Sequence, residues 1–104
     1  MKEIKAYIRS EKLDEVVSAL AHVDGLSGIS VSTITGFGRG RGRLRLVNFE
    51  THKKVEATCS DNLVLSVVSA IEKSARTGQR GDGKIYVSSI EQSTRIEDGS
   101  RNEP

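Results

Sequence analysis

The sequence contains little cysteine, few aromatic residues and no long apolar run, and each shortage excludes a class of protein. The single cysteine, Cys59, cannot form an internal disulfide and offers no metal cluster, so we interpret it as a small buried residue. Aromatic residues make up only 4% of the chain, so Val, Leu, Ile and Ala must supply the core. No apolar stretch approaches the ~20 residues of a membrane span, and no signal peptide is evident, which predicts a cytoplasmic protein.

Chain length and charge further limit the number of domains and the kinds of partner. A chain of 104 residues fits one small domain with a thin core, which oligomerisation would stabilise. The net charge of +2, from 16 basic and 14 acidic residues, is too balanced to indicate nucleic-acid binding by itself. The charges are unevenly distributed, because residues 36–45 hold four arginines and no acid, whereas residues 91–104 hold four acids and two arginines.

Alternating and helical patterns predict the elements of the first half. Residues 2–8 alternate as in a half-buried strand, and a helix capped by Ser10 should follow and end near Asp24 and Gly25. This helix has one continuous apolar stripe, made of Leu13, Val16, Val17, Leu20 and Ala21. β-Branched residues predict a second strand over 28–35. The Gly/Arg run over 36–43 cannot bury a core and predicts a mobile loop.

The second half contains two further strands, a helix and a last strand. Residues 44–49 and 53–59 are expected to form a ladder around a connection at 50–52. Ser60 or Asp61 can cap a helix that Gly78 ends. The apolar stripe of this helix comprises Leu63, Val64, Val67, Val68, Ile71 and Ala75. A strand over 84–89 follows, and the small and charged residues 98–104 should fray.

The resulting order, β-α-β-β-α-β, is the split βαβ or ferredoxin-like arrangement, an α+β fold. Two helices would cover one face of an antiparallel sheet and leave the other face open. Several strands have β-branched residues at positions of both faces. This pattern indicates that the open face associates with another chain.

One stretch, residues 77–87, combines closely spaced glycines with two cations. Glycines let backbone N–H groups approach a ligand, and cations supply the charge that a polyphosphate needs. The residues concerned are Gly78, Gly81 and Gly83 with Arg80 and Lys84. The stretch therefore predicts a phosphate-binding loop.

Two other interpretations of this stretch were weighed. Gly78 to Lys84 nearly matches a P-loop, but Ile85 stands where Ser or Thr would hold Mg²⁺. The glycines also close a helix rather than open one, so the P-loop hypothesis fails. The alternative is a helix cap at Gly78 followed by a tight turn at Asp82 and Gly83, without any ligand.

Three stretches resemble the PII family of trimeric signalling proteins, the nitrogen regulatory protein P-II family. Residues 1–9, with the helix pattern after them, resemble the family's first strand and helix. Thr35–Arg39 resembles the start of its T-loop, and Thr77–Ile85 resembles its B-loop signature. The resemblance implies a PII-like domain over residues 1–97, a T-loop at about 36–53, a B-loop at 77–84 and a flexible tail at 98–104.

The resemblance implies a homotrimer that binds an adenine nucleotide (ADP, AMP or ATP) in clefts between neighbouring subunits. The phosphates would be wrapped by the B-loop residues Gly81, Asp82, Gly83 and Lys84. The T-loop base would contribute Gly36, Phe37, Gly38 and Arg39. His52 is either a turn residue or, by the resemblance, a weak phosphate contact. The adenine side would be lined by Gly28, Ser30, Glu56 and Thr58, and Arg95 would reach in from the C-terminal segment. The T-loop would engage a regulated membrane transporter or enzyme.

The chain departs from the family pattern in its T-loop and at three site positions. Gly40 stands where the family has a Gln that holds Mg²⁺ and 2-oxoglutarate, His52 replaces a phosphate-binding Lys, and Glu97 replaces an Arg. The T-loop is shorter and has no tyrosine for uridylylation. These changes predict a divergent member that binds ADP or AMP at least as well as ATP, without 2-oxoglutarate and without a Gln side chain at position 40 to hold Mg²⁺. Some relatives of this kind are associated with inorganic-carbon uptake or carboxysomes and sense bicarbonate, and others are encoded beside heavy-metal efflux pumps.

Two other classes of protein fit the sequence less well. An RNA-binding domain of the RRM type has the same element order, and Phe37 with the nearby arginines could contact RNA. However, Phe37 follows the second strand instead of lying on the third, and no second base-stacking aromatic adjoins it. An enzyme is not expected, because His22 and His52 have no Ser, Cys or acid partner at a motif spacing.

Overall fold

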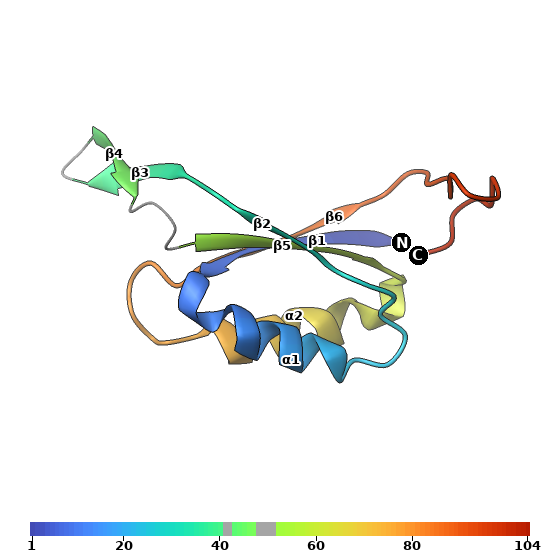
Figure 1. Cartoon of the computed structure of the whole chain (residues 1–104), viewed down its shortest axis with the longest axis horizontal. Helices are drawn as coiled ribbons and strands as arrows, with labels where there is room; N and C mark the ends of the chain where they lie inside the picture. The colour runs from blue at the N-terminus through green and yellow to red at the C-terminus, as the bar shows by residue number, and fades with distance from the viewer. Residues whose placement is uncertain (41–42, 48–51) are drawn as a thin grey trace.

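Two layers form the fold, an antiparallel four-stranded sheet and a pair of helices that cover one of its faces (Figure 1). The computed structural model describes residues 1–40, 43–47 and 52–104, and for 36–40 and 43–47 it describes the backbone alone. The elements are β1 (Lys2–Arg9), α1 (Leu13–Ala21), β2 (Ser30–Thr33), β3 (Gly36–Gly40), β4 (Arg43–Val47), β5 (His52–Cys59), α2 (Val64–Ala75) and β6 (Gly83–Ser89). Short 3₁₀ turns, Ser10–Lys12 and Asp61–Leu63, lead into the two helices.

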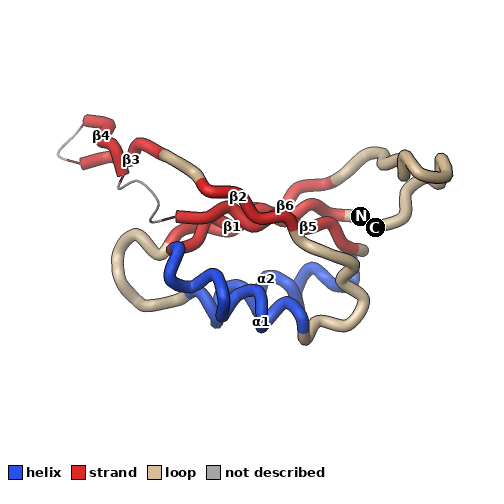
Figure 2. Tube along the Cα trace, viewed as in Figure 1, coloured by secondary structure: helices blue, strands red, loops and turns tan. Residues whose placement is uncertain are grey.

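The sheet has the strand order β2-β5-β1-β6, with β1 and β5 in the centre. The pairing of β1 is antiparallel on both sides, and Ile4 lies between Ala57 of β5 and Val87 of β6. Figure 2 shows both helices on the same side of this sheet. The predicted ferredoxin-like α+β arrangement is therefore confirmed for the four-stranded sheet and its helices.

The core lies between the sheet and the helices and contains aliphatic side chains and one thiol. Alternation along β1 and β5 points every second side chain at the helices. The buried residues are Ile4, Ala6, Ile8, Val55, Ala57 and Cys59 from the strands and Val16, Leu20, Val67, Ile71 and Ala75 from the helices. Each large aliphatic side chain buried in this way stabilises the fold by roughly 1.5–3 kcal/mol. Burial also raises the pKa of the Cys59 thiol, so its predicted role as a small buried residue is confirmed.

The open face of the sheet differs from the sequence-based expectation. The sequence predicts β-branched side chains on both faces, and in the two central strands Ile4, Ile8 and Val55 lie on the helix side, whereas Thr58 lies on the open face. The open-face positions of β1, β5 and β6 are occupied by Lys5, Tyr7, Lys54, Glu56, Lys84 and Tyr86. Tyr7 and Tyr86 meet edge to face, with ring centroids 6.0 Å apart. The two central strands therefore present mainly charged and aromatic side chains on the open face.

The helices begin differently from the prediction. Ser10 is not a helix cap, since it lies inside a 3₁₀ turn and Arg9 occupies the preceding position without a capping side-chain bond. Ser60 does precede the second turn, but its hydroxyl donates to Asn62 Oδ1 at 2.5 Å instead of bonding a helix N–H. The apolar stripe of α1 is also narrower than predicted, because Val17 is 39% exposed and Ala21 is exposed. Neither helix among the described residues is long and apolar enough to cross a membrane.

Most of the Gly/Arg run, which the sequence predicts as a mobile loop, forms one strand of a two-stranded ribbon. β3 pairs antiparallel with β4, from Gly36 opposite Val47 to Gly40 opposite Arg43. The predicted ladder between 44–49 and 53–59 is wrong, because β5 pairs with β1 and β2 and not with β4. The predicted connection at 50–52 lies largely outside the described residues, except for His52 at the start of β5.

The C-terminal segment beyond β6 closes into a turn. Thr94 bridges Arg101, the Arg95 amide donates to Ser100 O at 2.8 Å, and the Asn102 amide donates to Ser93 O at 3.0 Å. This turn and the β3–β4 ribbon extend from opposite ends of the sheet (Figure 1). The molecule therefore measures 49 × 25 × 20 Å, and the flexibility of residues 98–104 remains a prediction.

Candidate functional site

The B-loop, residues 77–84, is closed by the carboxylate of Asp82. The backbone amides of Thr77 and Gly78 each donate to Asp82 Oδ2 at 2.9 Å, and the Thr77 hydroxyl donates to Asp82 Oδ1. These bonds, together with the Arg9 guanidinium, hold the pKa of Asp82 well below its ordinary value of 3.8. The Asp82 carboxylate therefore organises the loop from within, and its charge is already paired.

Two side chains from the sheet hold the next part of the B-loop. Arg9, the last residue of β1, donates from Nε to Asp82 Oδ1 at 3.0 Å and from Nη2 to the Arg80 carbonyl oxygen at 2.7 Å. His52, directly opposite Arg9 on β5, lies with Nε2 3.1 Å from the Gly81 carbonyl oxygen. A carbonyl oxygen only accepts, so Nε2 carries the proton of this bond. The loop is thus attached to the ends of β1 and β5.

Glycine is required at two positions of the B-loop for different reasons. At Gly83, which lies opposite Ile8 and has a φ of +110°, a Cβ would lie 1.7 Å from the Tyr7 carbonyl oxygen. At Gly81, with a φ of +94°, a Cβ would lie 3.3 Å from Arg9 Nη2. The glycines therefore permit a close approach to β1 as well as a left-handed backbone. The second helix was expected to end at Gly78, but α2 ends three residues earlier, at Ala75.

The B-loop borders an open hollow of about 750 Å³ on the surface. Its lining includes Gly81, Asp82, Gly83 and Lys84, with Tyr7 and Tyr86 from the adjacent strands. Lys84 is exposed and lies opposite Tyr7 in the β1–β6 ladder. We call Gly81, Asp82, Gly83 and Lys84 the B-loop cluster. It combines glycine backbone and one exposed ammonium group beside a cavity, as anion binding requires.

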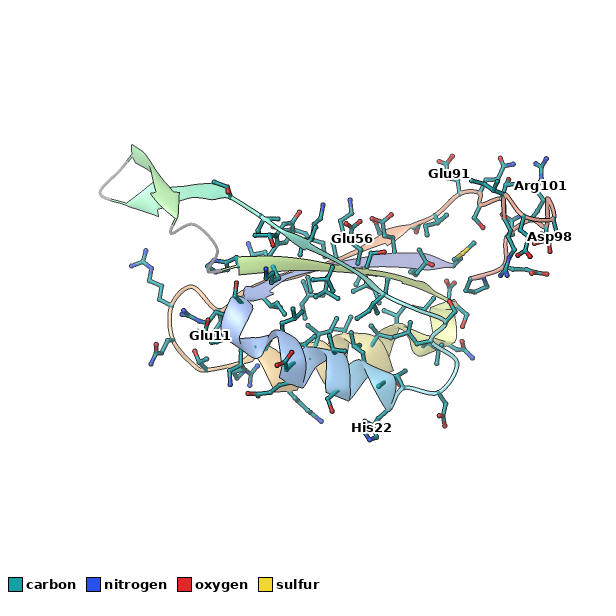
Figure 3. The ribbon with its side chains drawn as sticks, in the orientation of Figure 1. Glu11, His22, Glu56, Glu91, Asp98 and Arg101 are labelled. Atoms are coloured by element: carbon teal, nitrogen blue, oxygen red, sulfur yellow. The ribbon has the colours of Figure 1, made fainter. Side chains whose placement is uncertain are left out.

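A second hollow, of about 420 Å³, lies where β2 meets β5. Four predicted residues line it together, and we call them the β2–β5 cluster: Gly28, Ser30, Glu56 and Thr58. Ser30 lies directly opposite Glu56, and Thr58 lies opposite Glu3 of β1. The Glu56 carboxylate is 3.2 Å from Lys54 Nζ, and Figure 3 places Glu56 on the sheet face away from the helices. Hydroxyl and carboxylate groups therefore surround this hollow.

The two clusters lie toward opposite ends of the sheet. Thr58 is level with Glu3 and Gly83 is level with Ile8, a separation of five residues or about 16 Å along β1. Lys5, Tyr7 and Tyr86 occupy the sheet surface between them. The candidate residues of a single chain therefore line two separate hollows instead of one pocket.

The remaining predicted residues fall into two groups. Arg95 lies on the C-terminal turn, at the opposite end of the molecule from the B-loop (Figure 3, where its neighbours Asp98 and Arg101 are labelled). Gly36, Phe37, Gly38 and Arg39 form β3, and their side chains lie outside what the structure describes. The sequence-based prediction missed Arg9 as a part of the site. Arg9 lies opposite His52 at the start of β5. Only the register of β1 against β5 shows this, and the sequence alone does not give that register.

Comparisons with known proteins agree with the geometry. The family model for nitrogen regulatory protein P-II matches residues 1–100. The P-II protein of Bradyrhizobium diazoefficiens is 45% identical, with 95% of this chain and 94% of the relative covered. P-II proteins of Rhodospirillum rubrum and Microchaete diplosiphon are each 44% identical, covering 97% and 98% of this chain and 96% of each relative.

P-II regulatory proteins are signal transducers without enzymatic activity, so the prediction that this chain is not an enzyme is confirmed. The RRM-type alternative gains no support, because β3 with Phe37 lies outside the four-stranded sheet. The match extends from the first strand through the B-loop to the C-terminal turn, and the similarity to the relatives covers nearly the whole chain. The chain belongs to the nitrogen regulatory protein P-II family.

Proposed function

We propose that this chain binds an adenine nucleotide in clefts between neighbouring subunits of a homotrimer and passes the signal to a partner protein through its T-loop. The observation that carries the proposal is the division of the candidate residues into two half-sites on one chain. Family members form trimers and regulate target proteins. In a ring of identical chains, one end of each copy can face the other end of the next copy. The B-loop cluster of one subunit and the β2–β5 cluster of its neighbour would then share one cleft.

The chemistry of the two clusters suits the two parts of a nucleotide. The B-loop cluster offers glycine backbone and the exposed Lys84 ammonium, which favour phosphate groups. The β2–β5 cluster offers the Glu56 carboxylate, which accepts hydrogen bonds such as those of an adenine amine, and the hydroxyls of Ser30 and Thr58. In this arrangement Arg95 would approach the phosphates from the C-terminal turn of the neighbouring subunit.

We assign binding of the partner protein, which is the output of the signal, to the T-loop. The β3–β4 ribbon extends beyond the sheet at the same end as the B-loop (Figure 1), so a ligand there is close to the ribbon's base. A bound nucleotide would change the ribbon's order, and a membrane transporter or an enzyme would bind one of the two states. The relatives are named nitrogen regulatory proteins, and those names give no support to a bicarbonate or metal-efflux role.

Calorimetry with ADP tests the proposal. Lys84→Ala should weaken ADP binding about ten- to a hundred-fold, because a charge-assisted phosphate contact contributes roughly 1.5–3 kcal/mol. Lys73→Ala, which removes an exposed cation from the last turn of α2, should leave the affinity unchanged. With Gly40 and Glu97 in place, ADP or AMP should bind at least as well as ATP, and 2-oxoglutarate should add nothing. Absence of ADP binding by the wild type, or equal affinities for Lys84→Ala and the wild type, would refute the proposal.

A further inference from the structure

Two consecutive carbonyl groups of the B-loop are held from the same side. Arg9 donates to the Arg80 carbonyl oxygen at 2.7 Å, and His52 donates to the Gly81 carbonyl oxygen at 3.1 Å. Arg9 and His52 are direct cross-strand partners at the ends of β1 and β5. The sheet thus fixes the orientation of two successive peptide groups in a glycine-rich loop.

We propose that Arg9 and His52 are positioning residues, which set the direction of the Gly81 and Asp82 amides toward a phosphate without contacting it. A trans peptide group is planar, so its N–H points opposite to its C=O. The peptide bonds of the described chain are trans. With the Arg80 carbonyl directed at Arg9, the Gly81 N–H points away from the sheet end. With the Gly81 carbonyl directed at His52, the Asp82 N–H does the same.

Two adjacent amides held outward make an anion-binding site that is ordered before the ligand arrives. The Asp82 side chain contributes to this order, because its carboxylate ties Thr77 and Gly78 to Arg9 and closes the loop. The inference rests on the proposed function, since the anion in question is the nucleotide phosphate. It gives His52 a role different from the weak phosphate contact that the family resemblance implies.

The geometry of Gly81 supports the same conclusion. The Arg9 guanidinium approaches the loop so closely that a Cβ on Gly81 would lie 3.3 Å from Nη2, in a backbone with a φ of +94°. The Arg9 side chain is only 21% exposed, and both Nε and Nη2 are engaged by the loop. The Arg9 N–H groups that face the loop therefore donate to the loop itself.

Substitution of His52 separates positioning from direct contact. His52→Gln keeps an uncharged N–H donor near the place of Nε2, whereas His52→Leu removes the donor. If His52 acts by holding the Gly81 carbonyl, the Gln variant should bind ADP within about threefold of the wild type, and the Leu variant about tenfold more weakly. If His52 is a phosphate cation, both variants should lose affinity equally, and that result would overturn the assignment.

Substitution of Arg9 tests the other half of the proposal. Arg9→Lys keeps the charge but cannot donate in the same fork to Asp82 and the Arg80 carbonyl together. It should weaken ADP binding about five- to tenfold. Lys73→Met, which removes a cation from the outer surface of α2, should have no effect. Wild-type affinity in Arg9→Lys would mean that the guanidinium contributes charge alone and would contradict its positioning role.

Nuclear magnetic resonance on the ligand-free protein keeps this inference separate from the proposed function. The ¹⁵N–¹H heteronuclear NOEs of Gly81 and Asp82 should match those of the sheet in the wild type and His52→Gln. They should fall in His52→Leu and Arg9→Lys, while the α2 signals stay unchanged. Ordered amides in the Leu and Lys variants would overturn the inference even where ADP binds. Wild-type protein with ordered amides that binds no ADP would refute the proposed function alone.

Discussion

At the scale of single residues, the sharpest steric constraint in the described site is at Gly83. This residue begins β6 and lies so close to β1 that a Cβ would almost overlap the Tyr7 carbonyl oxygen, at 1.7 Å. Gly78, in the same loop, also has a positive φ, +84°, but a Cβ there would meet nothing within 4 Å. The two glycines therefore separate the cost of a left-handed backbone from the cost of a steric clash.

Gly83→Ala should destabilise the protein much more than Gly78→Ala. The left-handed backbone alone costs roughly 1–2 kcal/mol for alanine, which is the loss expected at position 78. At position 83 the strand must also move, so we expect a loss of about 3 kcal/mol or more. Denaturation in urea at matched protein concentration measures both variants. Equal losses would show that β6 can shift from Tyr7 without cost.

The Asp82 carboxylate makes the stability dependent on pH. Its pKa is lower in the folded chain than its ordinary value of 3.8, so ionised Asp82 stabilises the fold above that pH, and the contribution is lost as the pH falls below it. Asp82→Asn should therefore melt below the wild type at pH 7, and the difference should shrink toward pH 3. Asp24→Asn, an exposed change near the end of α1, serves as the control. A difference that persists unchanged at pH 3 would mean that the Asp82 charge is not responsible.

The residues of the candidate site could be proposed from the sequence where neighbouring residues carry the chemistry. The glycines and Lys84 of the B-loop stand together in the chain, and their types alone indicate anion binding. Arg9 was not predictable in this way, because 73 positions separate it from Asp82 and only the β1–β6 pairing brings them together. The bond of His52 to the Gly81 carbonyl likewise depends on how β5 is aligned with β1.

At the scale of elements, periodicity identified the strands and helices that have one buried face. β1, β5, α1 and α2 each carry apolar residues at the spacing of their own structure, and each contributes to the core. β4 overlaps the strand predicted over 44–49, but β3 escaped prediction because its alternating glycines carry no apolar pattern, and so β4 was assigned the wrong partner. The helix starts were missed by a few residues, because 3₁₀ turns replace the capping side chains.

The β3–β4 ribbon should respond to nucleotide. It pairs only with itself among the described strands, and an isolated two-stranded ribbon is marginally stable in water. Limited trypsin digestion should cut at the four arginines between positions 39 and 45 in the free protein, and saturating ADP should slow these cuts several-fold. Equal cutting of the ribbon with and without ADP would contradict a ligand-ordered T-loop.

At the scale of the whole molecule, the open sheet face and the divided site point to the same assembly. The face away from the helices carries charged residues and the Tyr7–Tyr86 pair, so association must satisfy polar groups as well as bury apolar surface. Along β1, Thr58 and Gly83 of the two clusters lie about 16 Å apart, whereas Glu56 and Lys84 are level with residues only two positions apart. A neighbour in the trimer would bring complementary clusters together, and no complete site would exist in a monomer.

Subunit mixing tests this central claim directly. Lys84→Ala damages the B-loop cluster, and Glu56→Ala damages the β2–β5 cluster, so each variant alone should bind ADP weakly. When the two are unfolded together and refolded, random assembly should make about one cleft in four from two intact clusters. Co-purification through a tag on one variant confirms that the chains have mixed.

The matched control mixes wild-type chains with the double variant Lys84→Ala/Glu56→Ala in equal amounts. Clefts shared between subunits again leave about one in four intact, whereas a site within one chain leaves about half. ADP calorimetry that finds a quarter of the clefts with wild-type affinity in both mixtures is the predicted result. No recovery in the first mixture, with half of the sites intact in the second, would contradict the account.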